Sequence, residues 1–345
     1  MFRLMSFLVL ILLLVAPTMA QEVTSITVVT HDSFSVSEEV LAMFEDETGI
    51  QIEILRSGDA GVMLNQSILS RANPLGDVMF GVDNTFLTRA LENDLFIPYE
   101  SPMLEHVPEQ FILDDEYRVT PIDYGDVCIN YDIAYFQEQG LPVPETLSDL
   151  TEPAYEEMLV VLNPATSSPG LAFLLVTIAN FGTEGDYTYL EYWRELVDNE
   201  VLVTDGWSDA YFGHFTAGSE DGTYPLVVSY ASSPPATYDA ETDAVATGSI
   251  IEDNTCYRQI EFAGILAGTE KVEAAQQFID FMLDVPFQED MPLQMFVFPV
   301  NENAELPELF AAYATIPEEP VMLTPEEIEA NREDWIQSWT ETVLR

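Results

Sequence analysis

Short strands and amphipathic helices alternate through the first quarter of the chain, and this alternation limits the possible folds most strongly. A β-branched run at 25–29 precedes a helix that Ser35 or Ser37 caps and that Gly49 ends. Strand, helix, strand and helix patterns then follow in turn at 50–55, 62–69, 77–82 and 85–92. This β-α-β-α-β order predicts a mostly parallel sheet with helices on its faces.

The rest of the chain predicts a second lobe, joined to the first by two crossing segments. An extended stretch around 117–131 leaves the first lobe, and a strand at 258–266 returns to it. The elements expected between these segments are a strand at 158–162, helices from Gly170 and Tyr187, and strands at 201–203 and 226–230. Helices at 270–283 and 325–343 are expected to close the chain on the first lobe. The predicted boundaries are 21–123 with 258–345 for lobe 1, and 124–257 for lobe 2.

The first twenty residues predict a secretory signal peptide. Arg3 precedes an apolar run at 4–15, and small residues follow at 18–20. A membrane-spanning helix requires about 20 apolar residues, so this run is too short to be one. No cysteine follows the expected cleavage point, so a lipid anchor is not expected there. The protein is therefore expected to be exported to the periplasm or another extracytoplasmic part of the cell envelope.

Acidic residues greatly outnumber basic ones. The chain has 61 Asp and Glu against 10 Lys and Arg, a formal charge of −51, and loss of Arg3 with the signal makes it −52. Nucleic-acid backbones and anionic lipid surfaces bind clustered basic residues, so neither partner is expected. The acids either keep the surface hydrated or concentrate a cationic ligand, and both interpretations stay open.

Familiar catalytic signatures are missing from the sequence. It contains no G-x-S-x-G, H-E-x-x-H or G-x-G-x-x-G motif and no phosphate-binding P-loop. Three histidines are too few for a His-rich metal site, and 61 acids make carboxylate pairs uninformative. A binding protein is therefore favoured over an enzyme, and no cofactor, catalytic residue or metal ligand is expected.

Polar segments follow four predicted strands, and one more forms a turn. In open α/β sheets, ligands collect at the carboxyl ends of the strands. These segments are 30–34, 81–84, 163–170, 229–234 and the turn 205–211. Together with DYG at 123–125, FPV at 298–300 and the closing segment 323–339, they resemble the thiamine-binding proteins of bacterial ABC importers. That resemblance, from about residue 25 onward, implies a type II periplasmic-binding-protein fold. Each of its two lobes is a mostly parallel sheet flanked by helices, and the two crossing segments form the hinge.

The resemblance also implies a function. The expected protein is a monomer that captures thiamine or a thiamine phosphate in the cleft between its lobes and delivers it to a membrane permease. One alternative is a thiamine-cleaving transferase on the same fold. Another is a binder of a different small cation, such as a polyamine or ferric ion. Thiamine joins a flat pyrimidine to a cationic thiazolium, so aromatic walls and carboxylates are its expected partners.

Aromatic residues supply the candidate walls. Trp207 lies in a turn next to glycine and is expected to face the ligand rather than the core, whereas Trp193 is expected in the core. Tyr230 ends a buried strand and faces either the cleft or the core. By the resemblance, two further aromatic residues of the family's site correspond to His31 and Phe296 in this sequence. It places another family tyrosine at or near Ala236, and Trp335 and Trp339 are expected to stack on the last helix.

Polar residues complete the predicted site. The loop 166–170 offers hydroxyl and N–H groups at a helix start, which suit either a ligand phosphate or plain N-capping by Ser167 or Ser168. Asp83 and the turn 59–61 are candidates to meet the aminopyrimidine or thiazolium, with a surface role as the alternative. The expected ligand-binding residues are His31, Asp32, Ser33, Asp59, Gly61, Asp83, Asn84, Thr166, Ser167, Ser168, Gly170, Trp207, Tyr211, Tyr230, Ser232, Ser233 and Phe296.

Cys128 and Cys256 are the only cysteines, and each lies in one of the two crossing segments that run side by side in this fold. Export to an oxidising space makes them candidates for a disulfide. Two separate buried thiols are one alternative. The other is a nucleophilic Cys128, as a thiamine-cleaving enzyme would use.

Overall fold

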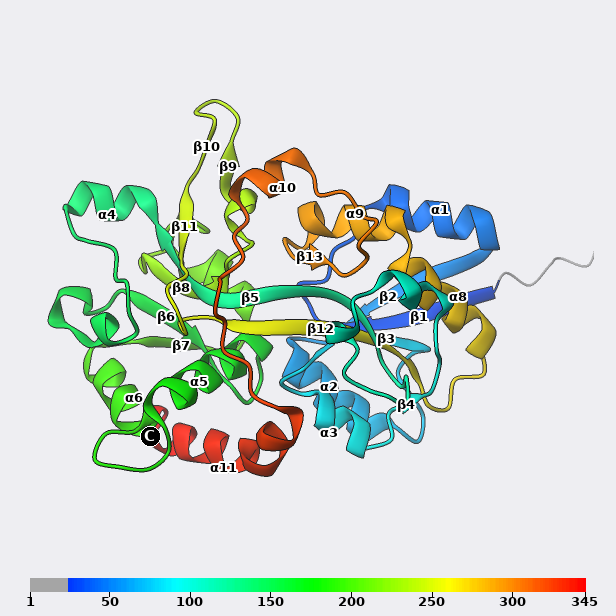
Figure 1. Cartoon of the computed structure of the whole chain (residues 1–345), viewed down its shortest axis with the longest axis horizontal. Helices are drawn as coiled ribbons and strands as arrows, with labels where there is room; N and C mark the ends of the chain where they lie inside the picture. The colour runs from blue at the N-terminus through cyan, green and yellow to red at the C-terminus, as the bar shows by residue number, and fades with distance from the viewer. Residues whose placement is uncertain (1–23) are drawn as a thin grey trace, which may run out of the picture.

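One mixed β-sheet runs along the whole molecule and carries helices on its faces (Figure 1). The computed structural model describes residues 24–345, so the predicted signal peptide lies outside the described residues. The strand order is β2-β1-β3-β12-β5-β8-β6-β7, with β4 paired to β12 and both β11 and β13 paired to β5. The strands of this sheet are β1 (Thr24–Thr30), β2 (Ile50–Arg56), β3 (Val78–Asp83), β4 (Phe96–Ile97), β5 (Thr120–Asp132), β6 (Leu159–Leu162), β7 (Leu202–Thr204), β8 (Leu226–Tyr230), β11 (Thr247–Ile250), β12 (Tyr257–Leu266) and β13 (Phe298–Pro299).

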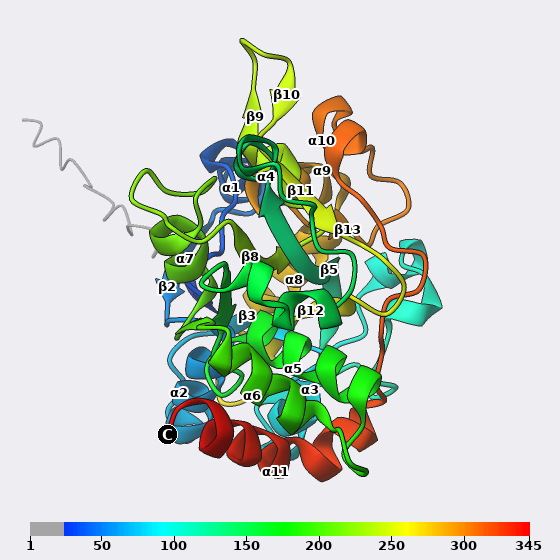
Figure 2. The same ribbon diagram turned by 90° about the vertical axis from the view of Figure 1, so that its left-hand side faces the viewer.

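Eleven α-helices are present in residues 24–345, together with short 3-10 and π segments. The α-helices are α1 (Glu38–Thr48), α2 (Ala60–Ser70), α3 (Leu87–Glu92), α4 (Ile133–Gln139), α5 (Ser168–Phe181), α6 (Tyr189–Asp198), α7 (Trp207–Asp209), α8 (Val272–Leu283), α9 (Val285–Gln294), α10 (Glu308–Tyr313) and α11 (Pro325–Val343). A separate hairpin, β9 (Tyr238–Asp239) with β10 (Ala244–Val245), projects from the molecule in both ribbon views (Figures 1 and 2).

Lobe 1 is built on the β-α-β-α-β order that the sequence predicts. β1 lies between β2 and β3 and runs parallel to both. The Ser37 side chain accepts a hydrogen bond from the N–H of Val40 at the start of α1, and Gly49 ends the helix at a φ of 71°. These local signals carry the prediction, because a hydroxyl at the N-cap satisfies a free N–H and glycine adopts the left-handed region without strain.

Lobe 2 repeats this arrangement with β6 parallel to both β7 and β8. Helices α5 and α6 pack together against it. Trp193 on α6 is almost fully buried, and its Nε1 donates to the Thr177 hydroxyl at 3.0 Å. Trp193 is therefore a core residue, as predicted.

The crossing strands β5 and β12 lie side by side and antiparallel between the lobes. β12 also pairs with β3 of lobe 1, and β5 also pairs with β8 of lobe 2. A disulfide joins Cys128 to Cys256, with 4.4 Å between their Cα atoms. Next to it, Arg258 forms a partly buried ion pair with Asp126 at 2.7 Å. The two strands are thus tied together by backbone, covalent and ionic contacts.

Helix α11 lies across the base of both lobes (Figures 1 and 2). Its bounds agree with the predicted helix, but it contacts α6 of lobe 2 as well as α3 of lobe 1. Trp339 packs edge-on against Trp193, with 5.4 Å between the ring centroids, and this contact replaces the predicted stack with Trp335. The boundaries predicted for the two lobes stay a prediction, and α11 bridges them.

Among residues 24–345, no helix combines the length and the apolar character that a bilayer-spanning segment requires.

Candidate ligand-binding site

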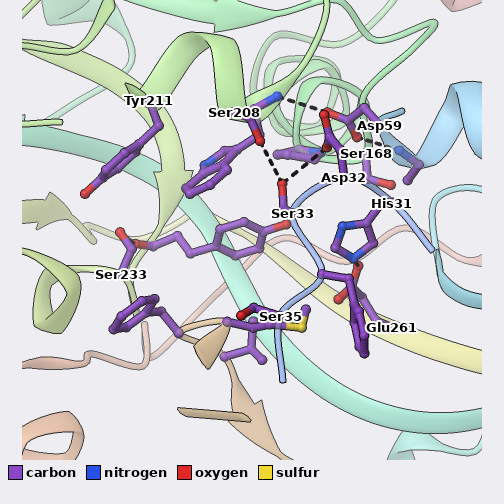
Figure 3. Close-up of a pocket in the computed structure, with 18 of the residues that line it drawn as sticks. His31, Asp32, Ser33, Ser35, Asp59, Ser168, Ser208, Tyr211, Ser233 and Glu261 are labelled. Atoms are coloured by element: carbon purple, nitrogen blue, oxygen red, sulfur yellow. Dashed lines mark hydrogen bonds and ion pairs between the residues drawn. The ribbon is translucent and has the colours of Figure 1, made fainter. Parts of the chain in front are cut away.

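A cavity of about 360 Å³ lies between the two lobes (Figure 3). Lobe 1 contributes the segments that follow β1 and β2, the start of α2, and the segment after α9. Lobe 2 contributes the start of α5, helix α7 with the π segment that follows it, and the end of β8. The crossing strand β12 forms part of the wall. The carboxyl ends of β1, β2 and β8 therefore meet at this cavity, as expected for an open α/β sheet.

Direct hydrogen bonds join the lobes at the edge of the cavity. The hydroxyl oxygens of Ser33 and Ser208 are 3.1 Å apart, and Asp59 accepts the backbone N–H of Trp207 at 2.9 Å. The N–H of Gly61 donates to the carbonyl of Thr166 at 3.0 Å. A side chain at Gly61 would place its Cβ 2.8 Å from that carbonyl oxygen, so only glycine permits this approach. These contacts hold the lobes together on this side of the cavity.

Aromatic rings line much of the cavity. The rings of Trp207 and Tyr211 stack, with 4.9 Å between centroids and 25° between planes, and Trp207 Nε1 donates to the Ser229 hydroxyl at 3.1 Å. Tyr230 also lines the cavity, and its hydroxyl donates to Gln259 at 3.3 Å. Phe212 packs edge-on against Trp207 and is 59% exposed. The cavity thus offers flat apolar faces of the kind that bind a planar ring.

Phe296 lines the cavity in a strained backbone conformation. Its φ is 57°, in the left-handed region that residues other than glycine seldom occupy. Such strain gathers at functional sites because the surrounding structure must hold the residue in place. Phe296 and its neighbours Met295 and Val297, after α9, all line the cavity.

His31 lies in the cavity wall as a buried, neutral ring. Burial, and next to it the charge of Arg56, lower the pKa of His31 to about 4. The ring packs against Phe80, with 5.8 Å between centroids. Gly81, at a φ of 99°, leaves room for the ring, because a Cβ there would lie 2.2 Å from His31 Cδ2. His31 therefore brings an uncharged aromatic surface to the cavity.

Carboxyl groups supply the polar part of the wall. Asp59 is the N-cap residue of α2, and its pKa is raised to about 6 mainly by burial, against hydrogen bonds from the N–H groups of Trp207 and Ala60. Glu261 on β12 and the exposed Asp32 also line the cavity. Arg56 is the one arginine in the lining, and its Nη2 donates to the carbonyl of Phe34 at 3.0 Å. The lining favours a cation over an anion.

The helix start at α5 lacks the serine cap that was one of its two sequence-based interpretations. Ser167 occupies the N-cap position, yet its side chain makes no capping hydrogen bond. The hydroxyl oxygens of Ser167 and Ser168 are buried, with no partner by hydrogen-bond geometry among the described residues. Asp59 and Asp83 lie close to these two hydroxyls. Plain N-capping by either serine is therefore wrong, and a bound phosphate here would meet two carboxyl groups.

The structure brings ten of the predicted residues to the cavity. They are His31, Asp32, Ser33, Asp59, Ser168, Trp207, Tyr211, Tyr230, Ser233 and Phe296. Ala236 is also in the lining, at the position where the resemblance expects a tyrosine. Their contact with a ligand stays a prediction.

Seven predicted residues lie outside the cavity lining, and some of them support the strands behind its wall. They are Gly61, Asp83, Asn84, Thr166, Ser167, Gly170 and Ser232. Asn84 shows this role most clearly, because its Oδ1 accepts the N–H of Ile260 at 3.0 Å and so fixes the crossing strand β12 to β3. Asp83 accepts hydrogen bonds from the N–H and hydroxyl of Thr85.

Several cavity residues were not predicted from the sequence. Arg56 ends β2, so the rule that ligands collect at strand ends could have found it. Gln259 and Glu261 are alternate residues of β12 that face the cavity, and Ser208 follows the predicted Trp207. The two β12 residues carry no sequence signal of their own, because only the pairing of the strands shows which face of β12 meets the cavity.

Comparison with known proteins agrees with this geometry. Residues 73–316 match the family model described as bacterial extracellular solute-binding protein, and the chain belongs to this family. The chain is 31% identical over 342 residues to the thiamine-binding periplasmic protein of Escherichia coli (strain K12), with 97% of this chain and 98% of that protein covered. It is also 31% identical over 335 residues to the protein of the same name from Brucella suis biovar 1 (strain 1330), covering 94% of each.

A solved structure has the same fold. The structure titled periplasmic thiamin binding protein superimposes with a TM-score of 0.81 at 29% sequence identity, covering 93% of this chain and 96% of that one. The predicted two-lobed periplasmic-binding-protein fold is therefore confirmed. Membership of an extracellular family also agrees with the export that the first twenty residues predict.

Proposed function

We propose that this protein captures thiamine in the cavity between its lobes and delivers it to the membrane permease of an ABC importer. The observation that carries the proposal is one cavity with stacked aromatic walls and carboxyl groups. Trp207, Tyr211, Tyr230 and Phe296 offer faces for flat rings, and the carboxyl groups of the lining offer a counter-charge. Thiamine has both features, a flat pyrimidine and a cationic thiazolium. The two relatives named thiamine-binding proteins, aligned along nearly their full length, support the same ligand.

A thiamine-cleaving activity has less support. Such an enzyme uses a cysteine thiolate as its nucleophile, and a sulfur held in a disulfide is not a thiolate. Cys128 is bonded to Cys256 and is fully buried, and neither cysteine lines the cavity. The protein therefore acts as a carrier that leaves thiamine intact.

A different small cation is the remaining alternative. A polyamine is flexible and aliphatic, so it does not need the flat stacked faces of Trp207 and Tyr211. A ferric ion needs several hard ligands, and within the described residues no group of three or more His, Cys, Asp and Glu side chains is placed to hold a metal ion. The aromatic lining favours thiamine over both.

Mass spectrometry of the ligand that co-purifies with natively folded protein tests the proposal. The protein should be expressed with its signal peptide and purified from the periplasm without denaturation. Thiamine or thiamine monophosphate in the released fraction, at close to one per protein, is the expected result. A polyamine or iron in its place would contradict the proposal. A parallel incubation with thiamine and a nucleophilic base should leave all thiamine unconsumed.

We propose that the protein works as a monomer. The cavity is formed by the two lobes of one chain, and each wall described above comes from that chain. Light scattering of the purified protein, with and without thiamine, should give the mass of a single chain in both cases. A ligand-dependent dimer would contradict this expectation.

A further inference from the structure

Three carboxylic acids lie in a row across the strands at the back of the cavity. Glu261 on β12 is the register partner of Asp83 on β3 and of Asp123 on β5. Side chains of register partners point to the same face of a sheet and have Cβ atoms about 4.5–5.5 Å apart. Asp83 and Asp123 are fully buried and Glu261 is 6% exposed. Among the three, Glu261 alone reaches the cavity lining.

The carboxyl groups of Asp123 and Glu261 are neighbours across the paired strands β5 and β12, because the two residues are register partners. Both oxygens of Asp123 are buried and have no hydrogen-bond partner by geometry within residues 24–345. Two neighbouring buried carboxyl groups cannot both ionise without strong repulsion, so they share a proton. Burial, and for Glu261 also the neighbouring Asp123 and Asp83, raise the pKa of both groups well above their ordinary values. In the ligand-free protein this pair therefore holds a proton.

No neighbouring positive charge neutralises the pair. His31 places its Nε2 3.5 Å from Glu261 Oε1 (Figure 3), but its lowered pKa leaves the ring neutral. The guanidinium of Arg258, on the same strand, is engaged by Asp126. Other titratable groups around Glu261 are Asp83 on β3, Asp123 on β5, Asp59 at the start of α2 and Tyr230 on β8. Arg56, at the end of β2, lines the same cavity, but its guanidinium donates to the carbonyl of Phe34. Acids dominate this set.

We propose that Glu261 is the residue that recognises the positive charge of the bound ligand, and that the Asp123–Glu261 pair releases its proton when the cation enters. This inference rests on the proposed function and adds to it a charge-selecting residue and a coupling to pH. The O–H bond of the shared proton breaks, the proton passes to solvent, and the carboxylate left behind faces the thiazolium. A neutral molecule of the same shape does not stabilise the ionised carboxylate. The pair therefore keeps its proton, and the molecule binds more weakly.

Calorimetry with thiamine and its neutral isostere 3-deazathiamine tests the proposal in the intact mature protein. Titrations in phosphate and in Tris at one pH measure proton release, because the two buffers differ in their heat of protonation. Thiamine should release up to about one proton, and its affinity should rise with pH by up to about tenfold per unit until the pair is ionised. Deazathiamine should release no proton, and its affinity should not change with pH.

Variants assign the effect to the two acids. Glu261→Gln should lose both the proton release and most of the preference for thiamine over deazathiamine. Asp123→Asn gives Glu261 an amide donor in place of a shared proton, so proton release should vanish while the preference for thiamine stays. Glu138→Gln, an exposed position on α4, should change neither and controls for the loss of one negative charge. Circular dichroism verifies the folding of each variant.

The outcomes separate this inference from the function on which it rests. Failure of the wild-type protein to bind thiamine at any pH would overturn both. Thiamine binding with no proton release and no dependence on pH would overturn this inference alone, as would a folded Glu261→Gln that keeps the full preference for thiamine. Because the wild-type titrations already decide between these results, the test does not depend on every variant folding.

Discussion

Replacing Trp207 by alanine removes the largest flat surface of the cavity. The indole is half-buried, stacks on Tyr211 at 4.9 Å, and is oriented by its Nε1 hydrogen bond to Ser229. Stacking of a ligand ring contributes about 0.5–1.5 kcal/mol beyond area burial, and a desolvated cation over an aromatic face contributes up to about 2 kcal/mol. We therefore expect Trp207→Ala to weaken thiamine binding by about 1–3 kcal/mol, or about 5- to 150-fold.

The contact of Asp59 with position 207 should survive this change, because the donor is the backbone N–H. Trp207→Phe keeps a ring but loses the hydrogen bond to Ser229, so its loss of affinity should be smaller than that of alanine. Trp193→Ala is the matched control, since Trp193 on α6 is buried against α5 and α11 and does not line the cavity. It should lower the free energy of unfolding by about 3–5 kcal/mol.

Isothermal titration calorimetry measures the affinities, and urea unfolding measures the stabilities. If Trp207→Ala folds with wild-type stability and binds thiamine as tightly as the wild type, Trp207 does not contact the ligand. The aromatic wall would then have to be assigned to Tyr230 and Phe296.

Three further predictions concern the disulfide, the acid at the start of α2 and the charge of the ligand. Thiol titration of the unfolded, unreduced mature protein should find no free thiol; reduction should lower stability by about 2–5 kcal/mol, because the bond spans 128 residues. Two free thiols would refute the bond. The pKa of Asp59 is raised to about 6, so its contribution to stability is full at acid pH and is lost as the pH rises through about 6. Asp59→Asn should therefore stabilise the ligand-free protein more at pH 8 than at pH 4. The difference should be about 1–3 kcal/mol, a range widened downward because the side chain is still partly exposed to solvent. An equal effect at both pH values in urea unfolding would contradict that cause. Thiamine and its monophosphate should bind comparably and the diphosphate more weakly, with a preference that grows at low salt, because the mature chain is strongly acidic and Arg56 is the one arginine in the lining; tightest binding of the diphosphate at low salt would refute this.

Local signals made much of the fold predictable. Helix α11 begins after Thr324, whose side chain accepts the N–H of Glu327, and Pro325 occupies its first turn. A hydroxyl N-cap followed by proline marks a helix start within a few residues, so the predicted and observed bounds agree. The packing of this helix against α6 could not be predicted from such local signals. Its contact with α6 joins residues far apart in the chain, which no local pattern reports.

The residues of the site fall into the same two groups, those that a local pattern marks and those that only the folded sheet brings together. Trp207 and Phe296 could be found because a turn or a family motif marks them. Glu261 could not, since its position opposite Asp123 depends on how β12 pairs with β5. The same limit explains the residues predicted in excess. Asn84 follows a strand end as the cavity residues do, but its side chain turns to the backbone of β12 instead of the cavity.

A calorimetric titration of thiamine into the ligand-free mature protein tests the central claim most directly. The account predicts saturable binding of one thiamine per chain, with all of the thiamine recovered chemically unchanged. No binding would contradict the assignment of the cavity to thiamine, and recovery of cleaved pyrimidine and thiazole products would contradict the assignment of the protein as a carrier.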